Sequence, residues 1–325
     1  MIEQGSVIRK QGGRIRVEKD DQVITEIPAI KLEGVVIYGN ASLTTPAMRF
    51  FLSHGVNTSF MNMYGKLEGR LTSLSAQNGL VRKAQILAST DEEWKMALAR
   101  SFVRAKISNQ RTLLSRHYRR KENERLAEVM GYLEHAFRQL EEVKDLDSLR
   151  GIEGNSSAVY FSGLRELVPP EMGFQSRVRR PPKDPVNAML SLGYSLLLAN
   201  VVSAIEAAGL DPYNGFLHGD KYGKPSLALD MMEEWRPVVV DSLVIASLRR
   251  KMFRPNDFIY EEEGTRFTQE ALRRFVQEYN GVLYREFKYG DRKEKRNYLF
   301  AFYAQGRMLA KHLMGQGAYK PFLMR

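Results

Sequence analysis

The sequence predicts a multidomain α+β protein in which a small β-rich N-terminal domain precedes a larger all-α domain. The first observation is a change of hydrophobic period near residue 76, from short apolar runs between turn residues to helical spacing. The second is the length of 325 residues, which is enough for two separate cores. We therefore predict a β-rich domain over 1–75, a linker over 76–90 and a helical domain over 91–325.

Turn residues divide the first 75 residues into short strands. Gly12-Gly13 can adopt the positive φ angles of a hairpin turn, and Asp20-Asp21 predicts a second turn. Pro46 favours the first turn of a short helix that ends at Gly55, because its missing N–H is not needed there. The expected strands cover residues 7–10, 14–19, 23–27, 35–38, 56–61 and 67–71.

Helical spacing dominates the remainder of the chain. Asp184 followed by Pro185 is a helix start, and Gly209 is a helix stop, which together predict an apolar helix over 185–208. This stretch approaches the roughly 20 apolar residues of a membrane span, but its interspersed polar residues favour a helix surrounded by other helices. Further helices are expected over 91–113, 122–142, 227–235, 268–279 and 297–314.

Composition narrows the setting and the chemistry. The N-terminus lacks the apolar segment of a signal peptide. Because the chain has no cysteine, disulfides and thiolate zinc sites are excluded. The composition fits a cytoplasmic protein, and we expect no membrane association. The sequence contains no phosphate-loop motif, no His-Glu-x-x-His and no Gly-x-Ser-x-Gly.

Positive charge predicts a polyanionic partner. The chain carries 49 Lys and Arg against 38 Asp and Glu, a net charge of +11. Such clusters bind phosphates without regard to sequence, and no base-reading motif accompanies them. Two tracts stand out: Arg100, Arg104, Lys106, Arg111, Arg116, Arg119, Arg120, Lys121 and Arg125, and then Arg177, Arg179, Arg180 and Lys183.

Glu153 and His218 are candidate functional residues, each with an ordinary alternative. Glu153 lies in Gly-Ile-Glu-Gly at the expected start of a helix, where an acid can simply complement the helix dipole by about 0.3–1 kcal/mol. His218 lies in a glycine-flanked loop, where it is either a ligand brought close to a substrate or a solvated surface residue.

Asp230 and Glu233 form a third candidate, three residues apart on the expected helix 227–235. That spacing lets both carboxylates face one point, whereas Glu234 turns elsewhere; the alternative is a solvated acidic face. Two carboxylate oxygens and one neutral imidazole suit Mg²⁺ or Mn²⁺. A metal site together with a basic surface points to phosphodiester chemistry.

Four long stretches resemble one family. They are 151–161 (GIEGNSSAVYF), 180–194 (RPPKDPVNAMLSLGY), 209–218 (GLDPYNGFLH) and 226–237 (SLALDMMEEWRP). Their order and spacing resemble the CRISPR-associated integrases of spacer acquisition, the universal Cas-one family, and the resemblance extends over essentially the whole chain.

The resemblance implies a site, a reaction and partners. Glu153, His218 and Glu233 match the family's metal ligands, and Asp230 matches a further acidic position that acts behind the ligands or as an alternative ligand. The implied activity is a metal-dependent DNA endonuclease and integrase, in which the 3′-OH of a foreign fragment attacks a phosphodiester of the CRISPR repeat.

The implied partners are double-stranded DNA, a second copy of the chain joined through the β-rich domain, the small adaptation partner Cas-two and a separate Cas-four nuclease. We further expect Arg179, Arg180 and Lys224 to contact DNA. Two other functions stay open at this point: a non-catalytic nucleic-acid-binding scaffold, and a general metal-dependent DNA nuclease or junction resolvase.

Overall fold

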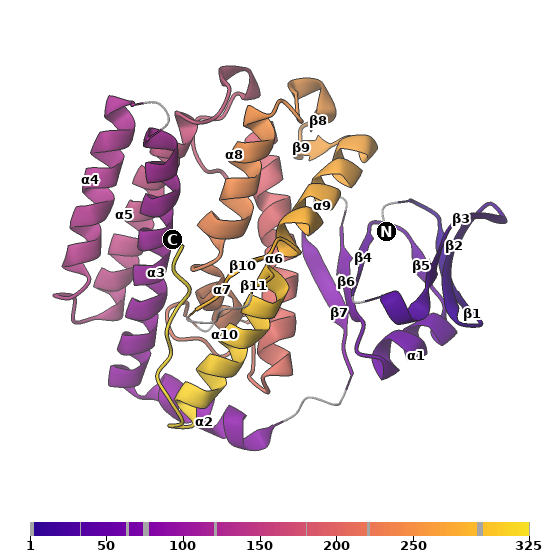
Figure 1. The fold of residues 1–325 in the computed structure, drawn as a ribbon, viewed down its shortest axis with the longest axis horizontal. Coiled ribbons are helices and arrows are strands. Elements are labelled where there is room, and N and C mark those ends of the chain that lie inside the picture. Colours follow the sequence, from indigo (N-terminus) through magenta and orange to yellow (C-terminus); the bar gives the residue numbers. More distant parts are fainter. Residues whose placement is uncertain are drawn as a thin grey trace. The chain divides into compact units, whose positions relative to one another are not determined.

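The fold comprises two compact units, Met1–Ala76 and Gln77–Arg325 (Figure 1). The computed structural model describes residues 3–32, 34–62, 65–73, 78–119, 122–179, 181–219, 222–290 and 295–324. The first unit is β-rich and the second is mainly helical, which confirms the predicted α+β class. The second unit also contains two short strand pairs, which the prediction of an all-α domain did not include.

Two small sheets and one helix make up the first unit. One sheet has the strand order β3-β2-β1-β5 and the other the order β4-β6-β7. Ile8, Ile15 and Ile37 are buried together against Phe51 from the helix, because alternate strand residues face the same side. The elements are β1 (Val7–Gln11), β2 (Arg14–Lys19), β3 (Gln22–Pro28), β4 (Gly34–Tyr38), β5 (Ser42–Leu43), α1 (Thr45–Ser53), β6 (Asn57–Met61) and β7 (Leu67–Leu71).

The turns of this unit lie where the sequence predicts them. Gln11 pairs with Arg14 across Gly12-Gly13, and Lys19 pairs with Gln22 across Asp20-Asp21. Both aspartates have positive φ angles, of 50° and 58°, as the tight hairpin turn requires. The short polar side chain of aspartate tolerates this conformation better than a branched one would.

Side-chain caps begin most of the helices of the second unit. Asn78, Asp91, Asn123, Asp145 and Asp184 each accept backbone N–H groups that the first helical turn leaves without partners. The helices are α2 (Gly79–Thr90), α3 (Glu92–Tyr118), α4 (Glu124–Gln139), α5 (Leu146–Arg165), α6 (Pro185–Ala207), α7 (Ser226–Met232), α8 (Ser242–Arg249), α9 (Gln269–Leu283) and α10 (Tyr298–Leu313).

Short elements connect these helices. In addition, the linker predicted over residues 76–90 is wrong. A π-helix over Arg236–Asp241 joins α7 to α8, and the strand pairs are β8 (Phe258–Glu261) with β9 (Gly264–Phe267) and β10 (Phe287–Lys288) with β11 (Lys295–Arg296). The interval predicted as a linker is largely helix α2, because Asn78 caps a regular turn there.

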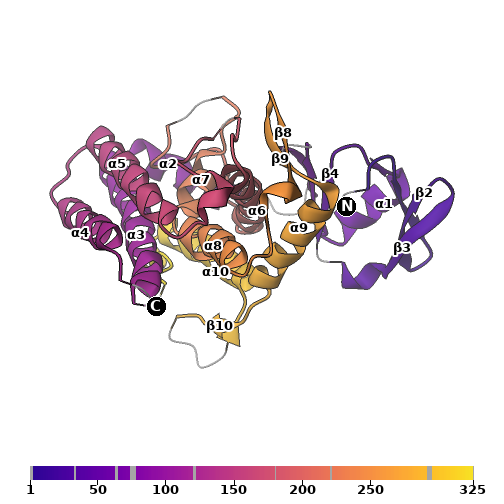
Figure 2. The same cartoon turned by 90° about the horizontal axis from the view of Figure 1, so that it is seen from above.

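Helix α6 runs through the middle of the second unit. It packs against α7, α8 and α10, while α3, α4 and α5 lie side by side as a second group of helices (Figures 1 and 2). By length and composition α6 could cross a membrane, but 78% of its most apolar window is buried inside the unit. It is the core helix that the sequence predicts, and its position fixes the elements that carry the candidate site.

Candidate active site

Glu153 projects from the middle of α5, not from the first turn of a helix. Asp145 caps the helix through Ser148, so α5 begins at Leu146 and Glu153 lies two turns further on. The alternative role of complementing the helix dipole is therefore excluded, because that effect is confined to the first turn. Ser157, one turn later, donates a hydrogen bond of 3.1 Å to Glu153 Oε1.

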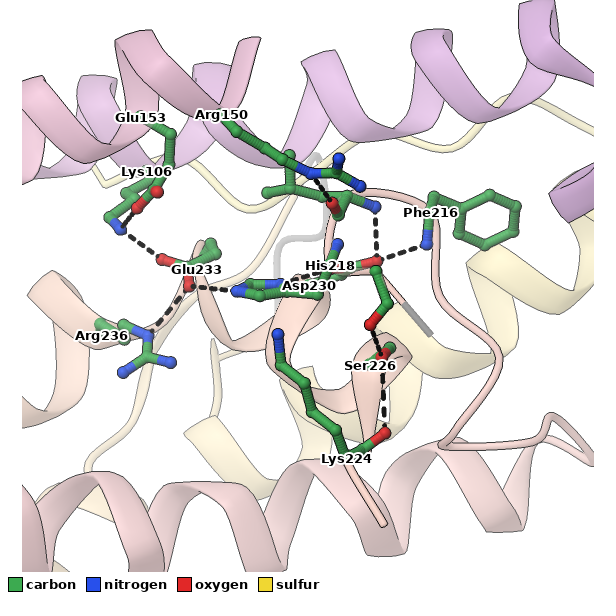
Figure 3. A network of polar contacts seen from close by, with 12 residues as sticks. Lys106, Arg150, Glu153, Phe216, His218, Lys224, Ser226, Asp230, Glu233 and Arg236 are labelled. Atoms are coloured by element: carbon green, nitrogen blue, oxygen red, sulfur yellow. Dashed lines mark hydrogen bonds and ion pairs between the residues drawn. The ribbon is translucent and has the colours of Figure 1, made fainter. Parts of the chain in front are cut away.

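His218 lies in the loop between α6 and α7, and Asp230 holds that loop. Oδ2 of Asp230 accepts the backbone N–H groups of Phe216 and Leu217 at 2.6 and 2.9 Å. Its Oδ1 accepts the His218 backbone N–H at 2.9 Å and the imidazole Nδ1 at 2.7 Å (Figure 3). A side chain at Gly215 would bring Cβ within 2.9 Å of the same carboxyl group, so only glycine allows this close approach.

The bond to Asp230 determines which nitrogen of His218 can bind a metal. Because a carboxylate only accepts, Nδ1 carries the proton and Nε2 keeps its lone pair. Metal-binding histidines commonly donate their second nitrogen to a carboxylate in this way. Each oxygen of Asp230 already accepts two hydrogen bonds. The geometry therefore favours Asp230 as a residue that supports the ligand His218, and it leaves no oxygen of Asp230 to bind the metal directly.

Glu233 follows the last residue of α7 and faces the other nitrogen of His218. Its Oε1 lies 4.0 Å from His218 Nε2 and 3.3 Å from Arg236 Nε. The side chain is only 3% exposed, so the alternative of a solvated acidic face is wrong for Glu233 and for the fully buried Asp230. The two carboxylates stand on opposite sides of one imidazole (Figure 3).

Lys106 connects the two glutamates. This residue of α3 forms an ion pair with Glu153 Oε1 and a second with Glu233 Oε2, the latter at 2.6 Å. Its side chain is 7% exposed. The sequence placed Lys106 within a basic tract, and its role was missed. The available signal was helical spacing: Phe102 lies four residues before Lys106 and Leu113 seven residues after it, which places the lysine on the apolar face of the helix.

The neighbouring cations keep Glu233 ionised. Burial alone would raise its pKa, but the cations Arg236 and Lys106, with a further contribution from the protonated form of His218, outweigh burial and hold the pKa at about 2. Burial likewise lowers the pKa of Lys106, yet Glu233 and Glu153 together raise it above the ordinary lysine value. The site therefore contains charged carboxylates balanced by cations of the protein itself.

The donor atoms suit a hard divalent cation, but their present spacing does not enclose one. Glu153, Glu233 and Nε2 of His218 supply two oxygens and a nitrogen, and Glu233 Oε2 is a buried atom without a hydrogen bond of acceptable geometry. Among the described residues, however, no three His, Asp or Glu side chains are close enough together to hold an ion. The Lys106 ammonium group lies between the two glutamates that would have to converge.

A further buried carboxyl group, that of Asp241, lies behind the site. Asp241, the last residue of the π-helix, accepts hydrogen bonds from Tyr160 of α5 at 2.8 Å and from Tyr194 of α6 at 2.5 Å. The Arg236 guanidinium group lies 4.7 Å from the centre of the Tyr194 ring. This network joins α5, α6 and the π-helix, and thereby fixes the direction from which Arg236 reaches Glu233.

Many residues of the predicted basic tracts have partners within the protein. Arg104 pairs with Glu141 at 2.6 Å, Arg111 pairs with Glu134, and the half-buried Arg177 donates to Asn187 at 2.8 Å. Arg179 is exposed, and Arg180 lies outside the described residues. Lys224 is half-buried at the base of the loop that carries His218 (Figure 3). The contacts of these three residues with DNA stay predictions.

Comparison with known sequences gives one family over most of the chain. Residues 1–281 match the family described as CRISPR associated protein Cas1. The CRISPR-associated endonuclease Cas1 3 of Thermus thermophilus is 36% identical over 100% of this chain and 96% of its own. A CRISPR-associated exonuclease Cas4/endonuclease Cas1 fusion of Geobacter sulfurreducens is 34% identical over 98% of this chain and 58% of its own.

Solved structures share the fold. A casposase bound to integration product superimposes with a TM-score of 0.86 and 26% identity, over 97% of this chain and 89% of that one. A Cas6-RT-Cas1–Cas2 complex superimposes with a TM-score of 0.83 and 25% identity, over 100% of this chain and 35% of that one.

Proposed function

Because the chain belongs to the CRISPR associated protein Cas1 family, we propose that it is a metal-dependent DNA integrase and endonuclease of CRISPR adaptation. The reaction is the insertion of foreign DNA fragments into the repeat array, by attack of a fragment 3′-OH on a repeat phosphodiester. One observation carries the proposal: three separate segments bring Glu153, His218 and Glu233 together, because both glutamates pair with Lys106 and His218 Nε2 lies 4.0 Å from Glu233 Oε1 (Figure 3).

Mg²⁺ or Mn²⁺ is the proposed cofactor, bound by Glu153, His218 and Glu233. When bound, such an ion polarises the phosphodiester and stabilises charge on the transferring oxygens. The protein contributes the geometry: Asp230 directs Nε2 of His218 into the site, and Arg236 holds Glu233 from the opposite side. Exchange of one phosphodiester for another requires no nucleotide cofactor and no covalent intermediate with the protein.

The surrounding charge favours an anionic substrate. Arg236 pairs with Glu233, so a divalent cation bound by Glu153 and Glu233 leaves the site with excess positive charge. A phosphodiester group supplies the missing negative charge, as expected for a site that acts on DNA. Water in place of the 3′-OH would produce hydrolysis, which accounts for integrase and endonuclease activity in one centre.

The relatives support a set of partners. The structure named Cas6-RT-Cas1–Cas2 complex supports association with the small adaptation partner, and the Geobacter sulfurreducens fusion supports work alongside a Cas4 nuclease. The casposase bound to integration product supports double-stranded DNA as substrate. We include a homodimer and a prokaryotic cytoplasmic location in the proposal.

A strand-transfer assay tests the function. A duplex fragment with free 3′-OH ends and a plasmid with a CRISPR repeat would be incubated with the protein and its small partner, with Mn²⁺, Mg²⁺ or EDTA. Glu153→Gln and His218→Ala are expected to abolish joining while DNA affinity is retained. Glu141→Gln is the matched control, because Glu141 is an exposed acid paired with Arg104 away from the site.

Three outcomes distinguish the candidate functions. Joining that survives EDTA or Glu153→Gln contradicts the metal centre. Cleavage without joining of 3′-OH ends indicates a general nuclease or junction resolvase, and DNA binding without any reaction indicates a non-catalytic scaffold.

A further inference from the structure

The ammonium group of Lys106 occupies the position between the two proposed carboxylate ligands. It lies 2.6 Å from Glu233 Oε2 and also contacts Glu153 Oε1 (Figure 3). The three side chains come from α3, α5 and the end of α7, so this one cation joins three separate parts of the second unit. Nothing in the proposed reaction yet uses it.

Charge explains why a buried lysine is present at this point. Glu153 and Glu233 are two like charges with little access to solvent, and their mutual repulsion would push the side chains apart. Arg236 contacts only the Glu233 side of the pair, at 3.3 Å. Lys106 is therefore the cation that keeps the two carboxylates directed toward each other in the described structure.

A divalent ion and the ammonium group cannot share this position. Oxygen ligands lie about 2.0–2.1 Å from Mg²⁺. The Lys106 nitrogen already stands 2.6 Å from one of the ligand oxygens. The two cations would also repel each other strongly in a site with little solvent. With the Lys106 ammonium group in this place, no three His, Asp or Glu side chains of the described residues lie around one point.

We propose that Lys106 is an exchangeable internal cation, which holds Glu153 and Glu233 together until a divalent metal displaces its ammonium group. This inference rests on the proposed metal-dependent function. The flexible four-carbon stem of lysine allows withdrawal without movement of α3. Lys106 is a positioning residue that preserves the ligand geometry, and it competes with the metal for the same oxygens.

Competition has a measurable consequence for metal affinity. The apparent affinity of a site is lowered by the fraction of molecules in which that site is blocked. Removal of the lysine charge therefore strengthens Mn²⁺ binding on the order of tenfold, while it weakens the metal-free fold. A lysine with a purely structural role would give the second effect and not the first.

Calorimetric Mn²⁺ titration of the full-length protein tests the inference. Lys106→Met keeps the length of the side chain and removes the charge; Lys83→Met, at an exposed position of α2, is the control. We expect a Kd about tenfold lower for Lys106→Met, a lower melting temperature in EDTA, and a larger rise of that temperature on addition of Mn²⁺. Unchanged or weaker Mn²⁺ binding by a folded Lys106→Met protein overturns the inference.

A crystal structure of the unaltered protein with Mn²⁺ gives an independent answer if Lys106→Met does not fold. Displacement predicts the Lys106 nitrogen beyond ion-pair distance from both glutamates; an ammonium group still on Glu233 Oε2 beside the metal refutes it. Failure of the proposed function is distinguishable, because Mn²⁺ binding would then be unaffected by Glu153→Gln in either background.

Discussion

Glu233 and Glu234 are adjacent and equally buried, yet their environments give them opposite charge states. Glu233 faces Arg236, Lys106 and His218, and its pKa is held at about 2. Burial raises the pKa of Glu234 to about 8, because only neutral donors from Tyr319, Phe322 and Gln305 oppose it. Burial alone therefore does not determine whether a carboxyl group is ionised; the charges of its neighbours do.

The two sides of this short segment consequently serve different purposes. The Glu233 side, lined by cations, keeps an ionised ligand available for a metal. The Glu234 side anchors the end of the chain: its carboxyl group contacts the Tyr319 hydroxyl and the Phe322 backbone N–H, and its carbonyl accepts from Asn109 at 2.8 Å. Trp235 stacks on Phe322 beside these bonds.

Glu233→Gln is expected to have the largest effect. Glutamine keeps the shape but removes the negative charge that Lys106, Arg236 and the proposed metal share. We expect the rate of strand transfer to fall at least on the order of 10²–10³-fold, the loss typical of one charge-stabilising group. The measurement is single-turnover joining of a 3′-OH fragment. Folding is checked by circular dichroism, because Arg236 loses its carboxylate partner and Lys106 loses one of its two.

The control for Glu233→Gln is Glu234→Gln, its immediate neighbour. Because Glu234 faces away from the cations, strand transfer by Glu234→Gln should stay near that of the unaltered protein. Equal losses in both variants would show that the difference between the two sides does not matter for catalysis.

Glu234→Gln should instead alter the pH dependence of stability. With a pKa of about 8 in the folded protein against an ordinary 4.5, the folded state retains a proton that the unfolded chain releases. The free energy of unfolding therefore falls as pH rises from about 4.5 to about 8, and the decrease is complete above that range. The variant lacks this decrease, so its stability relative to the unaltered protein should rise by a few kcal/mol between about pH 4.5 and pH 9, at about 1.4 kcal/mol per pKa unit.

Urea unfolding at a series of pH values measures that difference. Burial raises the pKa of Asp241 to about 6, but this residue is present in both proteins and its contribution cancels. A difference between variant and unaltered protein that is independent of pH from 5 to 9 would mean that Glu234 is ionised in the folded state.

Asp230→Asn should weaken metal binding without removing a ligand. Asparagine cannot accept with both terminal atoms, so it cannot hold the loop N–H groups and the imidazole Nδ1 at once. Loss of such a supporting carboxylate typically costs 10–100-fold in metal affinity, about 1.4–2.7 kcal/mol. Calorimetric Mn²⁺ titration measures it, with Glu141→Gln as the exposed acidic control. An unchanged Mn²⁺ affinity would mean that Asp230 only holds the loop and does not support metal binding.

The sequence predicts the elements and the candidate ligands better than it predicts their partners. Caps such as Asp184 and turns such as Asp20-Asp21 act within a few residues, so the sequence alone locates them. Glu153, His218 and Glu233 could be named because the four motif stretches resemble a known family. Their convergence depends on contacts between segments far apart in the chain, which no local pattern describes.

Lys106 and Glu234 show this limit most clearly. Lys106 pairs with residues 47 and 127 positions away, and Glu234 meets the chain end 85 and 88 positions later. A charge count assigns Lys106 to a DNA-binding surface, although it is buried against two carboxylates. The same count cannot recognise a buried carboxyl group, because acidic residues are usually solvated.

Arg104→Ala is expected to have the smallest effect, although Arg104 lies only two residues before Lys106 on α3. Its ion pair with Glu141 at 2.6 Å is exposed on both sides, with half or more of each side chain in solvent. Water already stabilises both charges, so we expect a loss of about 0–1 kcal/mol that shrinks as salt increases. Part of this loss comes from contact of the guanidinium group with the Phe137 ring, whose centre lies 5.0 Å away. Urea unfolding at low and high salt measures both contributions, since only the ion pair is screened. A salt-independent loss well above 1 kcal/mol would mean that exposed arginines of α3 stabilise the unit as the buried Lys106 does. The distinction between a cation-lined interior and a solvated surface would then no longer explain which charges contribute to stability.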